Sequence, residues 1–367
     1  MTGAAGALEA ERSQPTAAGA LTLDDFARLA RDRLTPETWD FLEGGAGDER
    51  TLRANTEAYE RARLYPRVLA GTGTPATETR ILGRTWAAPT AVAPMAYHTL
   101  VAPEGEVATA RGAGAAGVPF VVSTFAGRAV EDIAAAAMAP LWLQVYCFRD
   151  RSITRELVRR AERAGFEALV LTVDAPRLGR RPRDLRNGFT LPAGIRPANL
   201  TGDGFASPGE HALTAFDAGL DWSVVGWLRS VSALPVLLKG ILTAADARRA
   251  VEAGVDGIVV SNHGGRQLDG APPTLAVLPD VVAAVSGACP VLVDGGVRRG
   301  TDVLTALALG ADAALLGRPV LHALAADPET GVARMLAILA EELTTAMALT
   351  GTPTVRDTAP ELVRPRP

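Results

Sequence analysis

The residues with the clearest chemical potential lie together in the segment Ser261-Asn262-His263-Gly264-Gly265-Arg266-Gln267. The segment follows Gly257-Ile258-Val259-Val260, a short apolar run that predicts a buried strand. His263 can accept a proton near neutral pH, and Arg266 places a fixed cation three residues further along a turn that glycines loosen. The oxidation of a small hydroxy acid needs this combination, because its carboxylate must be held while its hydroxyl proton is removed.

Composition limits the classes of protein to which the chain can belong. With 367 residues, 48% of them hydrophobic and 21% charged, it can bury a large core and is not a disordered chain. The net charge of −4 gives no support for nucleic-acid binding, and no apolar run reaches the ~18–20 residues of a membrane helix. The expected location is therefore the cytoplasm. Cys147 and Cys289 lie in or beside apolar runs, which predicts buried free thiols and neither a disulfide nor a metal site.

The chain is expected to begin with a tail and a group of helices. Residues 1–21 are rich in Ala and Gly but lack the basic and apolar segments of a secretory signal, which predicts a flexible tail. Thr22-Leu23-Asp24-Asp25 resembles a capping box, and Thr35-Pro36 places a proline at a first helical position. Residues 22 to about 60 are therefore predicted to be helical.

Eight short apolar runs, each followed by a helical stretch, make up most of the remaining sequence. Each run is continuously apolar, which is typical of strands buried on both faces of a parallel sheet. Eight strand–helix units within about 240 residues favour a closed (β/α)8 TIM barrel over an open doubly wound sheet. The predicted strands are 89–93, 118–123, 141–146, 168–173, 235–239, 257–261, 290–294 and 313–317.

The connection after the fourth predicted strand is unusually long. About sixty residues separate Asp174 from Pro235, first rich in arginine and then in Pro, Gly and Thr. Connections of this length are usually functional or disordered. We therefore expect residues 175–234 to form a lid-like insertion within a single domain that spans residues 22–367.

Polar side chains follow nearly every predicted strand. Active sites of (β/α)8 barrels lie at the C-terminal ends of the strands, so these side chains are expected to gather at one mouth. One polar ending means little, but a nearly complete set predicts a large polar ligand across that mouth. The endings are Ala93-Pro94, Ser123-Thr124, Gln144 with Tyr146, Thr172 with Asp174, Lys239, Asn262-His263, Asp294 and Arg318.

The last two strand endings predict a phosphate site. Asp294-Gly295-Gly296-Val297-Arg298 follows the seventh predicted strand, and Gly317-Arg318 follows the eighth. Glycines let backbone N–H groups approach an anion, and arginine adds a forked donor. This is the usual phosphate position of such barrels, but it does not identify the phosphorylated ligand.

Lys239 ends its predicted strand within Val236-Leu237-Leu238-Lys239-Gly240. A lysine at that depth can form a Schiff base, pair with an acid, or face an electron-rich cofactor ring. Spacing alone leaves these three roles open.

Together these segments resemble the FMN-dependent 2-hydroxy acid oxidases and dehydrogenases, the family that includes glycolate oxidase, lactate oxidase and mandelate dehydrogenase. The resemblance covers roughly residues 22–352. The segments that carry it are Ala102-Pro103-Glu104-Gly105-Glu106, Leu143–Tyr146, Leu171–Asp174 with Gly179-Arg180-Arg181, Leu238–Gly240, Ser261–Gln267, Asp294–Arg298 and Gly317-Arg318-Pro319.

The resemblance implies an FMN cofactor across the mouth of the barrel. It implies that Lys239 faces the N1/O2 edge of the flavin, that polar strand ends hold the ring, and that the last two endings hold the ribityl chain and phosphate. The implied cofactor-binding residues are Pro94, Met95, Ala96, Ser123, Gln144, Thr172, Lys239, Ser261, Asp294, Gly295, Gly296, Arg298, Gly317 and Arg318.

The resemblance also implies roles around the substrate. Arg266 and Arg181 would hold the carboxylate by charge-assisted pairs. His263 would accept the hydroxyl proton, and Asp174 would orient the imidazole. Tyr146 would donate a hydrogen bond to a substrate oxygen. Whether C2 loses a hydride or a proton first stays open.

One departure from the family concerns the substrate pocket. Phe41 occupies the position where most members carry a tyrosine that touches the carboxylate, and Phe125 and Tyr97 lie at strand ends that contact substrate in relatives. An aromatic pocket favours an aryl substrate. Thr38–Ala46, Ala96–Leu100 and Asp184–Phe189 are most similar to the 4-hydroxymandelate oxidases. The resemblance thus implies oxidation of (S)-mandelate or 4-hydroxymandelate to the aryl 2-oxo acid, with O2 reduced to H2O2.

Other readings compete with this expectation. Within the family, the substrate can be lactate or another aliphatic acid, or the acceptor can be a quinone or cytochrome. Membrane-attached members carry an apolar insertion, whereas residues 187–220 contain several charged residues and no long apolar run, which favours an oxidase. A non-redox barrel would explain the phosphate endings but not His263 with Arg266. We expect a 2-hydroxy acid and O2 as partners, neither nucleic acid nor membrane, and, by resemblance, a homotetramer.

Overall fold

The fold is described from a computed structural model that gives residues 16–200 and 216–365. The parts of the predicted tail and insertion that fall in residues 1–15 and 201–215 lie outside the described residues. Residues 16–21 differ from the tail prediction, because they contain the 3-10 turn Ala17–Gly19 and bury Ala17 and Ala20. Small apolar side chains let this segment pack on the core rather than extend into solvent.

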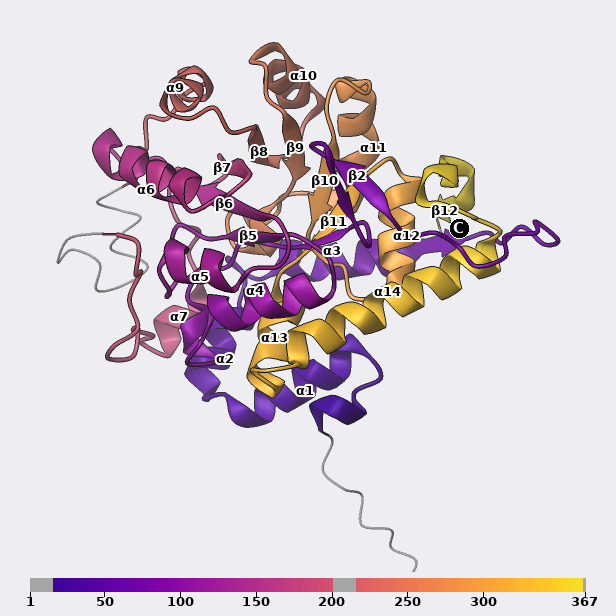
Figure 1. Ribbon diagram of the computed structural model, residues 1–367, viewed down its shortest axis with the longest axis horizontal. Helices are drawn as coiled ribbons and strands as arrows, with labels where there is room; N and C mark the ends of the chain where they lie inside the picture. Colours follow the sequence, from indigo (N-terminus) through magenta and orange to yellow (C-terminus); the bar gives the residue numbers. More distant parts are fainter. Residues whose placement is uncertain (1–15, 201–215, 366–367) are drawn as a thin grey trace, which may run out of the picture.

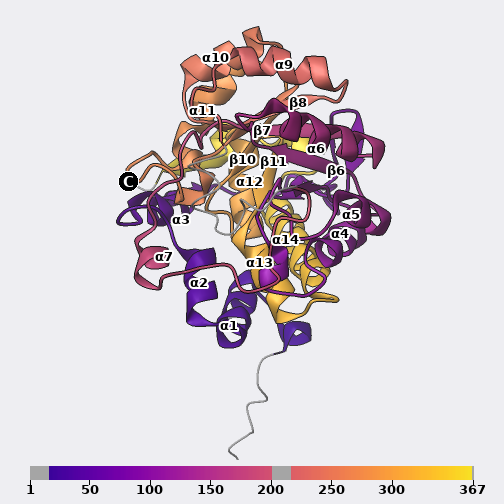
Figure 2. The ribbon, with the colours of Figure 1, turned by 90° about the vertical axis from the view of Figure 1, so that its left-hand side faces the viewer.

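The segment that the sequence predicts to be helical, residues 22 to about 60, contains three α-helices in the structure. Thr22 and Asp25 form the capping box of α1 (Leu23–Arg33), and Thr35 caps α2 (Pro36–Glu43), where its hydroxyl accepts the N–H of Thr38 at 3.3 Å. The third helix is α3 (Arg50–Arg61). Figures 1 and 2 both show α1 alongside α13 (Arg318–Ala326), and Phe26 of α1 is fully buried.

Eight parallel strands form a closed barrel, which confirms the predicted (β/α)8 fold. Each strand pairs with the next along the chain, and β11 pairs with β4 to close the ring. The strands are β4 (Thr90–Val92), β5 (Phe120–Val122), β6 (Leu141–Val145), β7 (Ala168–Thr172), β8 (Val236–Ile241), β9 (Gly257–Val260), β10 (Val291–Asp294) and β11 (Ala313–Leu316).

Helices surround the barrel, and in the described part of the chain two small sheets lie outside it (Figure 1). The remaining helices of the ring are α4 (Glu106–Ala115), α5 (Val130–Ala136), α6 (Arg151–Arg163), α9 (Ser223–Val231), α10 (Ala244–Glu252), α11 (Thr274–Val285), α12 (Gly300–Ala308) and α14 (Gly331–Thr350). The small sheets pair β1 (Ala62–Leu64) with β12 (Val363–Pro365) and β2 (Thr79–Ile81) with β3 (Arg84–Trp86). Within the described parts of the chain, no helix combines the length and the apolar character that crossing a bilayer requires.

The insertion after β7 divides into two parts. Its first part contains α7 (Pro182–Arg186), which lies beside α2 in both ribbon views. Its last part contains α9, which the prediction placed inside the lid-like insertion. This part of the prediction is wrong, because α9 buries Val224, Val225 and Leu228 and packs on β8 and α6 as a barrel helix.

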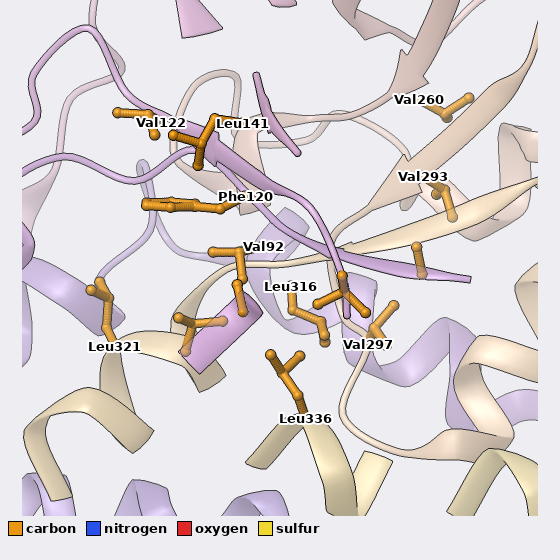
Figure 3. Packing of buried hydrophobic residues seen from close by; sticks show 14 of the residues in the cluster. Val92, Phe120, Val122, Leu141, Val260, Val293, Val297, Leu316, Leu321 and Leu336 are labelled. Atoms are coloured by element: carbon orange, nitrogen blue, oxygen red, sulfur yellow. The ribbon is translucent and has the colours of Figure 1, made fainter. Parts of the chain in front are cut away.

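Two apolar layers hold the barrel together. Inward-pointing residues such as Val121, Leu237 and Leu292 form one cluster with Trp86 of the β2–β3 hairpin. Alternate residues point outward and pack against the helices, since neighbouring side chains on a strand face opposite sides. Figure 3 shows this outer layer, in which side chains of several strands meet Leu321 of α13 and Leu336 of α14.

The same alternation brings polar residues to the barrel mouth. Every second side chain of a strand points inward, so the inward position after the apolar one lies at the C-terminal end of the strand. These positions are buried and polar in most units, which is rare for core residues without a function to serve. They are Ser123, Gln144, Thr172, Lys239, Ser261 and Asp294.

Candidate active site

His263 lies between Asp174 and Tyr146 at the mouth of the barrel. Its Nδ1 atom is 2.8 Å from Oδ1 of Asp174, and its Nε2 atom is 3.4 Å from the hydroxyl oxygen of Tyr146. A carboxylate only accepts hydrogen bonds, so Nδ1 carries the proton and Nε2 of the neutral ring remains a proton acceptor. The fold therefore brings together the three residues predicted to perform the chemistry.

The histidine turn, residues 261–267, has an unusual backbone. His263 has φ +58°, and Gly264 and Gly265 follow with φ +60° and +75°. The left-handed region is uncommon for a residue with a side chain, and the Ser261 hydroxyl stabilises it here by accepting the N–H of His263 at 3.0 Å. A Cβ on Gly265 would lie 2.6 Å from the backbone nitrogen of Leu52, so glycine lets α3 pack against the turn.

Asp174 is an ionised carboxylate, and one of its two oxygens has no hydrogen-bond partner among the described residues. Burial alone would raise its pKa, but interactions with His263 and Lys239 lower the pKa below the ordinary value of 3.8. Its main-chain carbonyl accepts Nε2 of Gln267 at 3.0 Å. Within residues 16–200 and 216–365, its Oδ2 atom is buried without a hydrogen-bond partner. The carboxylate is therefore fixed in place by its backbone as well as by His263.

Arg266 is held by the C-terminal end of α2. Its Nη1 atom donates to the carbonyls of Gly44 at 2.6 Å and Leu42 at 3.3 Å, and its guanidinium lies 5.4 Å from the ring centre of Phe41. Burial, and then the nearby cations Arg181 and Arg318, lower the pKa of Arg266 well below 12.5. Buried cations that repel one another create a site that favours an incoming anion.

Arg181 joins this cationic site from the insertion. Burial lowers the pKa of its guanidinium, and its Nε atom is buried without a hydrogen-bond partner in the described structure. Asp184 of α7 lies near both arginines, although burial raises the pKa of its carboxyl. The predicted pair Arg181 and Arg266 thus comes together, and a small carboxylate would satisfy donors that the chain leaves free.

Aromatic rings form the neighbouring wall. Phe216 stacks on Tyr146 with centroids 4.5 Å apart, Phe125 lies 5.7 Å from Tyr146, and Tyr97 lies 6.2 Å from Phe125. The hydroxyl of Tyr97 is buried and has no hydrogen-bond partner among the residues described. Burial raises the pKa of Tyr146, so its hydroxyl stays protonated and can donate. The wall offers flat apolar contact with a few polar atoms.

Phe41 has an aromatic partner of its own. Its ring stacks on Phe189 of the insertion, with centroids 4.4 Å apart and planes 12° apart. Phe41 is 6% exposed and belongs to α2, so this contact joins the insertion to the helix that holds Arg266. The position that carries a tyrosine in most of the family is therefore apolar on this chain and packed on both sides.

The buried polar side chains at the barrel mouth form a polar ring, and Lys239 lies at its centre. The ring consists of Ser123, Gln144, Thr172, Lys239, Ser261 and Asp294. The Nζ atom of Lys239 is 3.0 Å from Oδ2 of Asp294 and donates to the Ser261 hydroxyl at 2.7 Å. Burial would lower its pKa, but the charges of Asp294 and Asp174 raise it, so the ammonium stays charged. Two partners from the described chain leave one of its three N–H groups for a ligand.

Gln144 organises the other side of the ring. Its Oε1 atom accepts the N–H of Thr124 at 3.1 Å and the Ser123 hydroxyl at 3.4 Å, and its Nε2 atom donates to the Thr172 hydroxyl at 3.0 Å. This orientation of the amide follows from its partners. The three side chains are thus fixed before any ligand binds.

The predicted phosphate site, residues 294–298 with 317–318, is called the phosphate corner below. Of its two arginines, Arg318 is already hydrogen-bonded to backbone carbonyls, whereas Arg298 has more donors left for an anion. Arg318 donates through Nε to the Leu42 carbonyl at 3.0 Å and through Nη1 to the Gly264 carbonyl at 3.2 Å. Burial lowers the pKa of Arg318 to about 10, although Glu43 opposes this. Arg298 donates through Nη1 only to the carbonyl of Val297, 2.9 Å away, among its described neighbours. Arg298 and the glycine backbone are therefore the freer anion donors.

One cavity connects these groups. Of the residues predicted for the site, all but Asp174 and Ser261 line it. Asp174 stands behind His263, and Ser261 is fully buried between Lys239 and the N–H of His263. The Ser261 hydroxyl accepts from the Lys239 ammonium, and its predicted contact with the cofactor stays a prediction.

Phe216 also lines the cavity, although no pattern in the sequence singles it out. It pairs with Phe148 in an isolated antiparallel bridge as the insertion returns toward α9. An isolated aromatic residue in an aperiodic stretch carries no signal that would have identified it.

The barrel and this cavity define an enzyme with a phosphate corner, a buried lysine and a histidine–carboxylate pair facing two arginines. Residues 30–365 match the FMN-dependent dehydrogenase family. The chain therefore belongs to the family of FMN-dependent dehydrogenases.

Relatives of known function are similar over almost the whole chain. The 4-hydroxymandelate oxidase of Amycolatopsis orientalis is 51% identical over 339 residues, which cover 90% of this chain and 94% of the relative. A peroxisomal (S)-2-hydroxyacid oxidase of Arabidopsis thaliana is 46% identical, covering 94% and 96%. The L-lactate oxidase of Nostoc sp. is 46% identical, covering 92% and 96%.

A crystal structure of mandelate oxidase with (S)-4-hydroxymandelic acid also matches the fold. Its TM-score is 0.89 at 49% identity, over 94% of this chain and 98% of that one. Together these similarities extend across the barrel and the helices before it.

The cavity fits FMN by the chemistry of its donors and acceptors. Oδ1 of Asp294 is buried without a partner in the described residues and can accept a hydrogen bond from a ribityl hydroxyl. A Cβ on Gly317 would meet only the Met95 sulfur, at 3.6 Å, so this wall stays open. Arg298 and glycine N–H groups can hold a phosphate, and the spare N–H of Lys239 can hold an electron-rich ring edge.

Proposed function

We propose that this protein is an FMN-dependent oxidase of (S)-2-hydroxy acids with an aryl side chain, mandelate or 4-hydroxymandelate. The product is the aryl 2-oxo acid, and O2 is reduced to H2O2. One observation carries the proposal: the Nε2 atom of His263, the guanidinium groups of Arg266 and Arg181, and an aromatic wall line a single cavity.

Substrate binding begins with the carboxylate. Arg266 and Arg181 hold it, and their mutual repulsion falls when the anion arrives. The α2 carbonyls of Leu42 and Gly44 orient Arg266, so the carboxylate meets a guanidinium that is already in place. This fixes the 2-hydroxyl group next to His263 and Tyr146.

His263 then accepts the proton of the hydroxyl at Nε2. The Asp174 carboxylate holds the opposite nitrogen and stabilises the imidazolium that forms. The Tyr146 hydroxyl, 3.4 Å from Nε2, donates to the substrate oxygen.

When bound, FMN supplies the acceptor for the hydrogen at C2 and for the two electrons that the substrate loses. The residues that would hold it are those of the polar ring and the phosphate corner. Lys239 would hold the electron-rich edge of the flavin and would supply a positive charge there. Asp294 and Ser261 keep the lysine in that position.

The aromatic wall supports an aryl substrate over an aliphatic one. Tyr97, Phe125 and Phe216 give flat apolar contact to a ring, whereas a methyl group would leave much of that surface bare. Lactate is the second candidate, since a relative at 46% identity is an L-lactate oxidase. O2 as final acceptor, a homotetramer and a cytoplasmic location complete the proposal, the first supported by the names of the relatives.

A substrate panel tests the proposal. The purified protein, reconstituted with FMN, is mixed with lactate, (S)-mandelate and (S)-4-hydroxymandelate while oxygen uptake and peroxide are measured. We expect kcat/KM to be highest for an aryl acid, with one peroxide formed per oxygen consumed. Higher kcat/KM for lactate would reject the aryl assignment, and absence of flavin absorbance near ~450 nm after reconstitution would reject the flavin chemistry.

A further inference from the structure

A buried pair of amides joins α3 to the histidine turn. Nδ2 of Asn55 donates to Oδ1 of Asn262 at 2.9 Å, and Nδ2 of Asn262 donates back to Oδ1 of Asn55 at 2.8 Å. The two side chains are 2% and 4% exposed. Away from water, each buried amide needs polar partners, and each finds one of them in the other.

On one side, this pair controls the shape of the histidine turn. Oδ1 of Asn262 also accepts the N–H of Gly265 at 3.1 Å, and its Nδ2 donates to the Pro272 carbonyl at 3.0 Å. The bond between Asn262 and Gly265 closes the turn across His263, which has the left-handed backbone. The Asn262 amide therefore helps to hold the turn that carries His263.

On the other side, Asn55 contacts the segment predicted to bind the ribityl chain and phosphate. Its Oδ1 atom accepts the N–H of Thr274 at 3.4 Å, and the Thr274 hydroxyl donates to the Asp294 carbonyl at 2.5 Å. A Cβ on Gly296 would lie 2.3 Å from the carbonyl oxygen of Asn55, so the two backbones touch. Asn55 is thus the common neighbour of residues 261–267 and residues 294–296.

We propose that Asn55 is a positioning residue that keeps the histidine turn in register with the FMN-binding segment 294–298. It does not line the described cavity, so it acts through Asn262 and through Thr274 with Gly296. The inference rests on the proposed function, which gives His263 the proton transfer and residues 294–298 the cofactor. Loss of the Asn55 side chain leaves buried partners unsatisfied on both sides, and both must shift to find new ones.

The experiment compares Asn55→Ala and the milder Asn55→Ser with the wild-type protein. Apoprotein is titrated with FMN, and the rate constant of flavin reduction by (S)-mandelate is then measured anaerobically at saturating FMN and substrate. We expect FMN binding to weaken by about 10-fold and reduction to slow by about 10-fold or more in Asn55→Ala, the effect of an unpaired buried amide. Combining it with Asn262→Ala is expected to cost less than the sum of the two single changes, because both break the same pair, while Asn262→Ala also removes the bonds to Gly265 and Pro272.

Asn199→Ala is the matched control. Asn199 is a buried amide (5% exposed) that accepts the N–H of Val130 and donates to the Arg128 carbonyl, both at 2.9 Å, and it does not line the described cavity. We expect it to lower the melting temperature as Asn55→Ala does, while FMN affinity and the reduction rate stay within about 2-fold of wild type.

Three outcomes would overturn the inference: Asn55 variants that behave like the Asn199 control, that lose only FMN affinity, or that lose only reduction rate. Failure of the wild-type protein to bind FMN or to be reduced by any 2-hydroxy acid would instead reject the proposed function.

Discussion

Gly240 and Asp174 lie so close that a Cβ on Gly240 would fall 2.6 Å from the Cβ of Asp174 and 2.8 Å from its Cγ. Gly240 also has φ +114°, which residues with side chains rarely adopt. The residue after Lys239 is therefore a glycine because the carboxylate partner of His263 occupies the space beside it.

This contact predicts the effect of Gly240→Ala. The added methyl group must displace Asp174 from His263, so flavin reduction by (S)-mandelate is expected to slow by about 10-fold or more. Stopped-flow absorbance measures the rate. Gly254→Ala is the control for backbone strain, because Gly254 also has positive φ but open space around its Cβ. Equal rates in the two variants would show that Asp174 tolerates the displacement.

His263→Ala is expected to slow flavin reduction by about 10²–10⁴-fold, the usual contribution of a positioned base. FMN affinity should change little, because the imidazole contacts Asp174 and Tyr146 rather than the phosphate corner. Anaerobic single-turnover bleaching and an FMN titration separate the two quantities. Bleaching at the wild-type rate would exclude His263 as the base.

Asp174→Asn is expected to change both rate and stability. The pKa of Asp174 is lower in the folded protein, so its carboxylate stabilises the fold above the unfolded value of ~3.9, and this stability is lost as pH falls through the lower folded pKa. The melting temperature of the wild type should therefore fall more steeply below about pH 4 than that of the variant. If the melting temperatures of the wild type and the variant fell equally with pH, the lowered pKa of Asp174 would be contradicted. At neutral pH, the variant should also reduce its flavin more slowly, since an amide supports an imidazolium poorly.

Arg266→Met is expected to weaken binding of substrate and of carboxylate inhibitors by about 10–100-fold, the loss of a buried charge-assisted pair. FMN affinity should stay within about 3-fold, because the Arg266 guanidinium bonds to Leu42 and Gly44. Benzoate titration followed by flavin absorbance measures the first quantity. Arg248→Met, a change on helix α10, serves as the control for loss of charge. Unchanged benzoate affinity in Arg266→Met would remove this residue from the carboxylate site.

Phe41→Tyr is expected to raise kcat/KM for lactate relative to mandelate by several-fold. The new hydroxyl would lie near Arg266 and offer the carboxylate a further donor, which helps a small acid most. Phe189→Leu removes the stacked partner of Phe41 without adding a hydroxyl and so isolates the effect of packing. An unchanged ratio of the two kcat/KM values in Phe41→Tyr would contradict the assignment of this position to the substrate pocket.

Much of the site could be predicted because the barrel is a repeating structure. Inward positions recur every second residue, so the polar endings at Gln144, Thr172 and Lys239 had to share one mouth once the eight strands closed. The glycines at the strand ending 294–296 likewise indicate an unusual backbone conformation, and Gly295 and Gly296 indeed have φ +92° and +96°. These features depend on local periodicity and on residue type, which the sequence states directly.

The sequence could not predict contacts between distant segments that no repeating pattern relates to each other. Asn55 and Asn262 are 207 residues apart, and nothing in the spacing of either one indicates the other. Phe216 pairs with Phe148, 68 residues earlier, and the side chain of Arg318 turns toward the Leu42 carbonyl of α2.

The sequence by itself therefore determined the barrel, its functional end and the types of group gathered there, because strand periodicity and residue chemistry are local properties. Only the tertiary structure decided which partner each group meets, because that depends on how α2, α3 and the insertion pack over the mouth. These elements pack so closely that a Cβ at Gly240 or Gly296 would clash with a neighbouring residue and force the arrangement to change.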